Sequence, residues 1–344
     1  MHREIGSEFW DVPTTDEKNS LFSEQTQWYL SGRSALNAII NSLQGCHTAA
    51  IPSWHCDSMV APFIKAGFDV KFYPVYWRNT LVQKPILDCD VLLIMDYFGY
   101  STETPDLSSY KGTVIRDVTH SMFSKEYYDS DYYFGSLRKW CGVWTGGFAW
   151  ARDKHRLIEG DPEEGDYSDL RRKAMQYKSE YINGSRTEKD HLTLYVEAEE
   201  QLDALYVVRA SERDVNMAAH LDTGIMVSAR RRNAEILRKA FPELLIFPEM
   251  QSTDCPMFVP ILVPNGKRDE LRQYLVHNDI YCPVHWPVSE HLQQFLDDRT
   301  YEIYSDELSL VCDQRYLEDD MERTVETIRS FLRTGNNGIY SLYN

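Results

Sequence analysis

The sequence lacks the features that mark three common classes of protein. No apolar run among its 344 residues is long enough to cross a bilayer, and the N-terminus MHREIGSEFW has no apolar core of a signal peptide. Basic residues are scarce, since 36 Lys and Arg face 53 Asp and Glu, and the formal net charge is −17. Such a chain repels nucleic-acid phosphates and anionic membranes. We therefore expect a cytoplasmic protein without a nucleic-acid or membrane partner.

Metal and disulfide patterns are also missing. The seven cysteines never form a CxxC pair, and the ten histidines form neither an HxH nor an HExxH motif. Scattered cysteines in a cytoplasmic chain are expected to be reduced packing residues. No metal site is predicted.

What the sequence does contain is an alternation of short apolar runs and helical patterns. Strands are expected at AAIP, DVKFYPV, DVLLIMDYFG and GTVIRDVTH, and helices at residues 32–44 and in DSMVAPFIKAG. This alternation predicts an α/β layer with a mainly parallel sheet, whose ligands gather at the carboxyl ends of the strands. Polar and aromatic residues collect at those ends.

The second half predicts a smaller unit. A long amphipathic helix is expected from about residue 190 to 215, where it would bridge two domains. The helical patterns ARRRNAEILRKAF, KRDELRQYLVHNDI and TVETIRSFL and the strand CPMFVPILV follow it. We expect an N-terminal arm and large domain over residues 1–215 and a small α+β domain over residues 216–344.

One lysine has an unusual setting, in SLRKW at residues 136–140. The aromatic run DYYF precedes it, and CGVWTGG follows, with glycines that permit close backbone approach. Most lysines only face solvent. A lysine desolvated among aromatic residues has its charged form disfavoured, and its neutral amine can form a Schiff base. Lys139 is therefore a candidate nucleophile.

Asp117 ends the strand TVIRD, and His120 follows three residues later. As structural residues they would cap a turn and fill a core. Beside a Schiff-base lysine, the carboxylate would instead hold the pyridine nitrogen of pyridoxal phosphate (PLP) protonated, which makes PLP a better electron sink. His120 would then hydrogen-bond the phenolic oxygen of the cofactor.

Two further segments suit a flat, phosphorylated ligand. SGRSAL at residues 31–36 places Ser, Gly and Ser at a helix start, where they cap the helix and where free N–H groups favour a phosphate. Trp54 and His55, in PSWHCD, follow a strand and either stack on a flat ring or line a cleft.

Taken in order, SGRSAL, IPSWH, MDYFG, RDVTHS, SLRKW with its later glycine pair, and YCPVHWP resemble the fold-type I PLP enzymes, specifically the DegT/DnrJ/StrS-like sugar aminotransferases. The resemblance covers roughly residues 25–330. It implies a three-layer large domain with a mainly parallel sheet, a smaller C-terminal α+β domain, and a homodimer whose interface holds the active site.

The resemblance also implies a role for each matched residue. Lys139 would carry the cofactor, Asp117 would pair with its ring nitrogen, His120 would contact its hydroxyl and Trp54 would stack on its ring. The phosphate would be held by Gly32, Arg33, Ser34 and Ser136. The substrate would face His285 and Trp286. Arg315 would contact a carboxylate or phosphate of the substrate, with a surface salt bridge as the alternative.

The chain departs from the family pattern at two positions. Arg33 stands where a small hydroxyl residue is common, and Phe134 stands where a serine is common, five residues before the lysine. These departures bear on phosphate binding and on nucleotide-sugar specificity.

The sequence thus predicts a PLP-dependent aminotransferase. It would move an amino group from an amino-acid donor, glutamate being the first candidate, to a keto acceptor such as a keto-sugar of surface-polysaccharide or secondary-metabolite synthesis. Two alternatives stay open. A PLP-dependent lyase or desulfurase would use the same lysine and aspartate, with Cys282 as the thiol near the substrate. A catalytically inactive protein of this fold would only bind a ligand.

Overall fold

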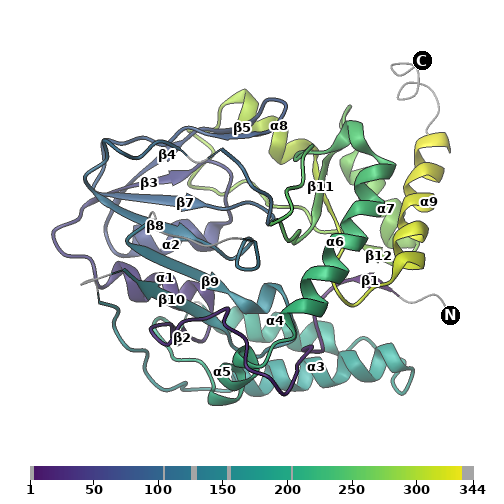
Figure 1. Ribbon diagram of the computed structural model, residues 1–344, viewed down its shortest axis with the longest axis horizontal. Coiled ribbons are helices and arrows are strands. Elements are labelled where there is room, and N and C mark those ends of the chain that lie inside the picture. Colours follow the sequence, from purple (N-terminus) through teal and green to yellow (C-terminus); the bar gives the residue numbers. More distant parts are fainter. Residues whose placement is uncertain (1–3, 104, 125–129, 153–155, 203, 335–344) are drawn as a thin grey trace.

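The computed structural model describes residues 4–103, 105–124, 130–152, 156–202 and 204–334. A seven-stranded sheet forms the large part of the molecule, in the order β2-β10-β9-β8-β7-β3-β4 (Figure 1). Its strands are β2 (Gln27–Tyr29), β3 (Thr48–Pro52), β4 (Asp69–Tyr73), β7 (Val91–Met95), β8 (Thr113–Asp117), β9 (Tyr132–Ser136) and β10 (Gly147–Ala151). The five strands β4, β3, β7, β8 and β9 pair in parallel with one another, and β10 runs antiparallel to both its neighbours, β9 and β2. The expected mainly parallel α/β sheet is confirmed.

The central strands are buried along almost their whole length because helices cover both faces of the sheet. All five residues of β7, VLLIM, are buried. On one face lie α1 (Gly32–Ile40), which contacts β9 and β10, and α2 (Asp57–Lys65), which packs on α1 and β4. On the other, α5 (Glu212–Ala219) and the start of α6 (Thr223–Ala240) bring Ala218 and Met226 into one cluster with Tyr133 and Phe148.

The smaller region lies beside the sheet, at the right of Figure 1. It contains α6, β11 (Val259–Leu262), α7 (Arg268–His277), β12 (Ile280–Tyr281), β13 (Glu307–Leu310) and α9 (Glu318–Thr334). β11 and β13 pair antiparallel, and β1 (Ile5–Gly6) pairs in parallel with β12. The N-terminal segment is therefore part of the packing of this region.

The chain also returns to the large sheet after the predicted boundary at residue 215. Helix α8 (Asp298–Asp306) packs on β5 (Val75–Trp77), which forms a hairpin with β6 (Leu81–Gln83). Its Ile303 and Tyr304 belong to the same apolar cluster as the central strands. Two regions thus exist, but their contacts cross the predicted boundary.

The long helix expected over residues 190–215 is wrong. Helix α4 (His191–Gln201) ends early, the chain then runs extended past the sheet edge, and α5 follows. Backbone hydrogen bonds explain the break: the N–H of Leu30 donates to the carbonyl of Val208, and the N–H of Ala210 donates to that of Trp28. Helix α3 (Tyr167–Asn183), which was not predicted, pairs with α4 at the lower edge of the molecule (Figure 1). In the described part of the chain, no helix has the length and apolar character of a membrane span.

Candidate active site

Lys139 and Asp117 lie at the same edge of the large sheet. Asp117 is the last residue of β8 and pairs in register with Phe134 of the parallel strand β9. Lys139 ends the short 3₁₀ helix Leu137–Lys139 that directly follows β9. Because carboxyl ends of parallel strands meet at one edge, both residues stand where α/β proteins bind ligands.

The glycine pair after the lysine permits a close approach between β10 and the start of α1. Gly146 has a φ of +132°, which residues other than glycine rarely adopt. A Cβ on Gly147 would lie only 1.9 Å from the carbonyl oxygen of Ser31. A Cβ on Gly32 would lie 3.2 Å from the Cβ of Ser136. Two of the predicted phosphate residues, Gly32 and Ser136, are therefore neighbours.

A cavity of about 1040 Å³ opens above this edge, between the large sheet, helix α4, the N-terminal segment and the small region. Lys139, His120, His285, Trp286 and Arg315 are among the residues that line it. Within the described ranges, no residue forms a hydrogen bond or ion pair with the Lys139 amine. Lys139 is exposed, so the predicted desolvation among aromatic residues is not found, and its amine is available to a ligand in the cavity.

Asp117 is a buried carboxyl with a raised pKa. The backbone N–H of Thr119 donates to its Oδ1 at 2.8 Å. Burial raises the pKa of Asp117 to about 6, despite the hydrogen bonds from Thr119. An ionised carboxylate here is thus short of compensating charge, and a cationic ring nitrogen would supply it.

His120 presents a neutral ring to the cavity. The N–H of Phe98 donates to its Nδ1 at 3.2 Å, which leaves the ring proton on Nε2. Burial, reinforced by His285 and Lys139, holds the pKa of His120 well below its usual range. The ring stacks on Trp286 with centroids 5.8 Å apart and planes 24° apart. A hydrogen-bond donor on Nε2 matches the predicted contact with the cofactor's hydroxyl.

Trp54 supports the cavity wall from behind. Its ring is fully buried, stacks on Tyr97 at 4.9 Å, and meets Trp286 edge-on at 5.8 Å. Its Nε1–H donates to the carbonyl of His285 at 2.6 Å. Trp286 lines the cavity and Trp54 does not. In this arrangement the aromatic face offered to a ligand is that of Trp286, because Tyr97 and Trp286 cover Trp54.

The predicted phosphate residues divide into two groups. The backbone N–H of Ser34 donates to Ser31 Oγ at 3.1 Å, and its hydroxyl lies within hydrogen-bond distance of the carbonyls of Leu205 and Tyr206. Ser34 therefore has no donor left for a phosphate. Gly32 and Arg33 are partly exposed at the helix start, and Arg33 lines a separate hollow of about 140 Å³.

Three of the predicted site residues carry charges that act on the thiol of Cys56. Burial raises its pKa and Ser58 lowers it, while Lys139 and Arg33 act to lower it and Asp117 to raise it. Arg33, Asp117 and Lys139 are thus all within electrostatic range of one partly buried cysteine.

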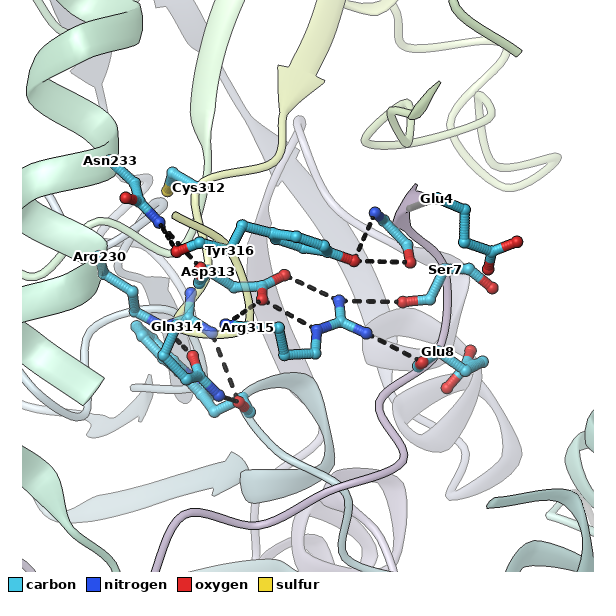
Figure 2. A network of polar contacts seen from close by, with 12 residues as sticks. Glu4, Ser7, Glu8, Arg230, Asn233, Cys312, Asp313, Gln314, Arg315 and Tyr316 are labelled. Atoms are coloured by element: carbon cyan, nitrogen blue, oxygen red, sulfur yellow. Dashed lines mark hydrogen bonds and ion pairs between the residues drawn. The ribbon is translucent and has the colours of Figure 1, made fainter. Parts of the chain in front are cut away.

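Arg315 has a structural role in this arrangement. Figure 2 shows its guanidinium bound to both carboxylate oxygens of Asp313 and to the carbonyls of Ser7 and Glu8. Next to it, the hydroxyl of Tyr316 accepts from the N–H of Gly6 at 2.8 Å. These contacts tie the N-terminal segment to the small region. The salt bridge of Arg315 with Asp313 is buried and not at the surface, as the alternative had placed it, and few donors of Arg315 remain for a substrate.

Cys282 lines the cavity but does not resemble a reactive thiol. Burial raises the pKa of Cys282 to about 12, so the sulfur is protonated at neutral pH. A desulfurase requires an ionised, mobile thiol, and this observation argues against that alternative. No cluster of His, Cys, Asp and Glu suited to a metal ion occurs within the described ranges.

Sequence reasoning missed the wall formed by α3 and α4. It contributes Arg171, His191, Tyr195 and Glu199 to the cavity. His191 is buried, neither of its ring nitrogens has a hydrogen-bond partner in the described part of the chain, and burial lowers its pKa to about 4. The sequence of α3 is polar and charged, and nothing in it indicates that Arg171 is buried beside the cavity.

The residues present fit PLP. The amine of Lys139 and the neutral imidazole of His120 line one cavity, and the buried carboxyl of Asp117 lies at the same edge of the sheet. A partly exposed helix start lies beside Ser136. A ring nitrogen would compensate Asp117, and the cavity has room for both cofactor and substrate.

Comparison with known proteins supports the fold. The sequence matches no family model and no curated protein. Its structure resembles a DegT/DnrJ/EryC1/StrS aminotransferase of Brucella abortus, with a TM-score of 0.59 and 15% identity over 89% of this chain and 85% of that one. For Helicobacter pylori PseC, an aminotransferase involved in pseudoaminic acid biosynthesis, the TM-score is 0.60 and the identity 12%, over 95% of this chain and 100% of that one. For Spr1654 of Streptococcus pneumoniae, assigned as a sugar aminotransferase and solved in its PLP-form, the TM-score is 0.59 and the identity 12%, over 93% of this chain and 92% of that one. The chain therefore has the fold of these aminotransferases.

Proposed function

We propose that this protein is a PLP-dependent aminotransferase that takes an amino group from an amino-acid donor, glutamate being the first choice, and passes it to a keto acceptor of the sugar class. PLP would supply the electron sink that transamination requires. The acceptor class is carried over from the sugar aminotransferases whose fold the chain shares.

The chain's own residues divide the work. Lys139 would bind the cofactor through its amine and, once displaced by the donor, move a proton to and from the reacting carbon. Asp117 would keep a proton on the ring nitrogen. His120 Nε2 would donate to the ring hydroxyl, and Trp286 would offer an aromatic face.

The active site is proposed to lie at the interface of a homodimer. Leu192 and Val196 of α4 line the cavity and are 47% and 57% exposed. Apolar side chains that remain exposed beside a polar cavity are typical of surface that a second chain covers.

One observation carries the proposal. In the described part of the chain, the amine of Lys139 has no partner, although it stands in a cavity rich in carboxylates, near a buried carboxyl of raised pKa. A structural lysine would pair with one of those carboxylates, as Lys189 does with Glu4 at 3.2 Å.

Chemical trapping tests the proposed bond. Incubation with PLP followed by borohydride reduction should fix a phosphopyridoxyl group on one peptide, and mass spectrometry should place it on Lys139. Lys189, which lines the same cavity but is paired, is the internal control and should remain unmodified. Modification spread over several lysines, or confined to another one, would remove Lys139 from its assigned role.

A further inference from the structure

Arg171, on α3, is a buried cation that forms two long ion pairs but no hydrogen bond with the described residues. Its side chain is 2% exposed and lines the cavity. Its nearest carboxylate oxygens, on Glu8 and Glu199, lie 3.5 and 3.8 Å away, and no described residue accepts a hydrogen bond from it. Its Nε is wholly buried without an acceptor. A guanidinium carries five N–H donors, and burying them unpaired is costly. Arg171 therefore retains hydrogen-bond donors that no described residue accepts.

The surroundings of Arg171 hold its plane and add a second guanidinium. The ring of Tyr195 lies under it, with the centroid 4.8 Å from Cζ. Arg138, the residue before Lys139, pairs with Glu199 at 2.9 Å and donates to the hydroxyl of Tyr167, and its Nε is likewise buried without an acceptor. Two buried guanidinium groups therefore share one carboxylate, which is 48% exposed.

The charge of Lys139 also affects the carboxyl group of Glu199. Burial acts to raise the pKa of Glu199, but Arg138, Lys139 and Arg171 together hold it at about 2. Glu199 is thus ionised at every working pH and lies within electrostatic range of Lys139. A carboxylate bound here would lie in the cavity that Lys139 also lines.

We propose that Arg171, with Arg138 beside it, binds a carboxylate of the amino-acid substrate, and that Glu199 occupies this place when no substrate is present. The inference rests on the proposed function and specifies which group of the donor is recognised, and by which residues. The planar guanidinium fork matches a carboxylate in two parallel hydrogen bonds.

The exchange is feasible because it conserves charge. Glu199 is half exposed on α4, so it can turn toward solvent when a substrate carboxylate enters. One negative group then replaces another beside the same two cations. Because Glu199 competes for the site, its removal should strengthen substrate binding, whereas removal of Arg171 should weaken it.

Glutarate is a suitable probe, since it carries carboxylates but no amino or keto group and cannot react. Its affinity is measured by titration calorimetry, on the protein alone and after incubation with PLP. We expect Arg171→Gln to weaken binding roughly tenfold or more, because it removes charge-assisted hydrogen bonds. We expect Glu199→Gln to tighten binding several-fold. Arg172→Gln is the matched control, because Arg172 is the next residue of α3, is 49% exposed and pairs with Asp169.

Opposite shifts in Arg171→Gln and Glu199→Gln, with Arg172→Gln unchanged, would support the proposal. Equal affinities in all four proteins would overturn it. If Arg171→Gln does not fold, Arg171→Lys keeps the charge without the fork and should still weaken binding, and a gain in Glu199→Gln cannot come from misfolding. Glutarate binding through Arg171 in a protein that forms no bond to PLP would leave the carboxylate site standing and overturn only the aminotransferase.

Discussion

Replacing Lys139 with alanine is expected to lower the rate of amino transfer by at least about 10³-fold, because both the covalent link to the cofactor and the proton carrier are lost. The variant should also lose the visible absorbance of lysine-bound PLP. Amino transfer is measured as keto acid formed from glutamate, and the bond as the absorbance spectrum after addition of PLP.

The same variant should fold normally. Since no described residue pairs with the Lys139 amine, its removal leaves no buried group unsatisfied, and the free energy of unfolding should change by no more than about 0.5 kcal/mol. Lys239→Ala is the control, because Lys239 lies on the surface of α6, 74% exposed and paired with Glu235. A Lys139→Ala protein with the wild-type spectrum and rate would contradict the assignment.

Asp117→Asn should slow turnover by about 10²- to 10³-fold, comparable to the loss of one preorganised electrostatic partner. Asparagine has the same size and can still accept from the N–H of Thr119, so the fold is kept. What is lost is the negative charge that keeps the ring nitrogen protonated. Asp90→Asn is the control: Asp90 precedes β7 at the opposite edge of the sheet, where the N–H groups of His47 and Thr48 donate to it. Equal rates in Asp117→Asn and Asp90→Asn would remove Asp117 from the mechanism.

The burial of Asp117 gives this variant a second signature. Its pKa is about 6 in the folded chain against an ordinary 3.8, so the folded state holds the proton more tightly than the unfolded state. The contribution of Asp117 to stability is therefore present at low pH and is lost as the pH rises from about 4 to about 6, on the order of 3 kcal/mol. Urea unfolding of the ligand-free proteins should show Asp117→Asn gaining stability relative to the wild type across this window. A difference independent of pH would mean that the carboxyl is not held in a desolvated place.

The sequence predicts the sheet well because burial on both faces leaves a clear signal. A run such as VLLIM cannot face water on either side, and a run ending in an acid, such as TVIRD, also marks the edge where ligands bind. Lys139 was predicted from neighbouring aromatic residues and glycines. The close backbone approach is present at Gly147, but Lys139 is exposed rather than desolvated, and its role stays a prediction.

The errors have a common cause, since tertiary contacts decide between locally similar patterns. Residues 190–215 read as one helix, but Val208 pairs with Leu30 at the sheet edge and breaks it. The role of Trp54 stays a prediction, but tertiary contacts again decide its setting, because Tyr97 and Trp286 enclose it. Arg171 was missed because α3 is rich in charged residues, and its sequence does not show which of its arginines is buried.

The measurement that tests the central claim most directly is the absorbance spectrum of the purified protein with PLP, before and after addition of glutamate. The account predicts a visible band of lysine-bound cofactor that glutamate converts to the absorbance of the amine form, which completes the first half of amino transfer. A protein that develops no such band with PLP would contradict the role of Lys139 and the enzyme built on it.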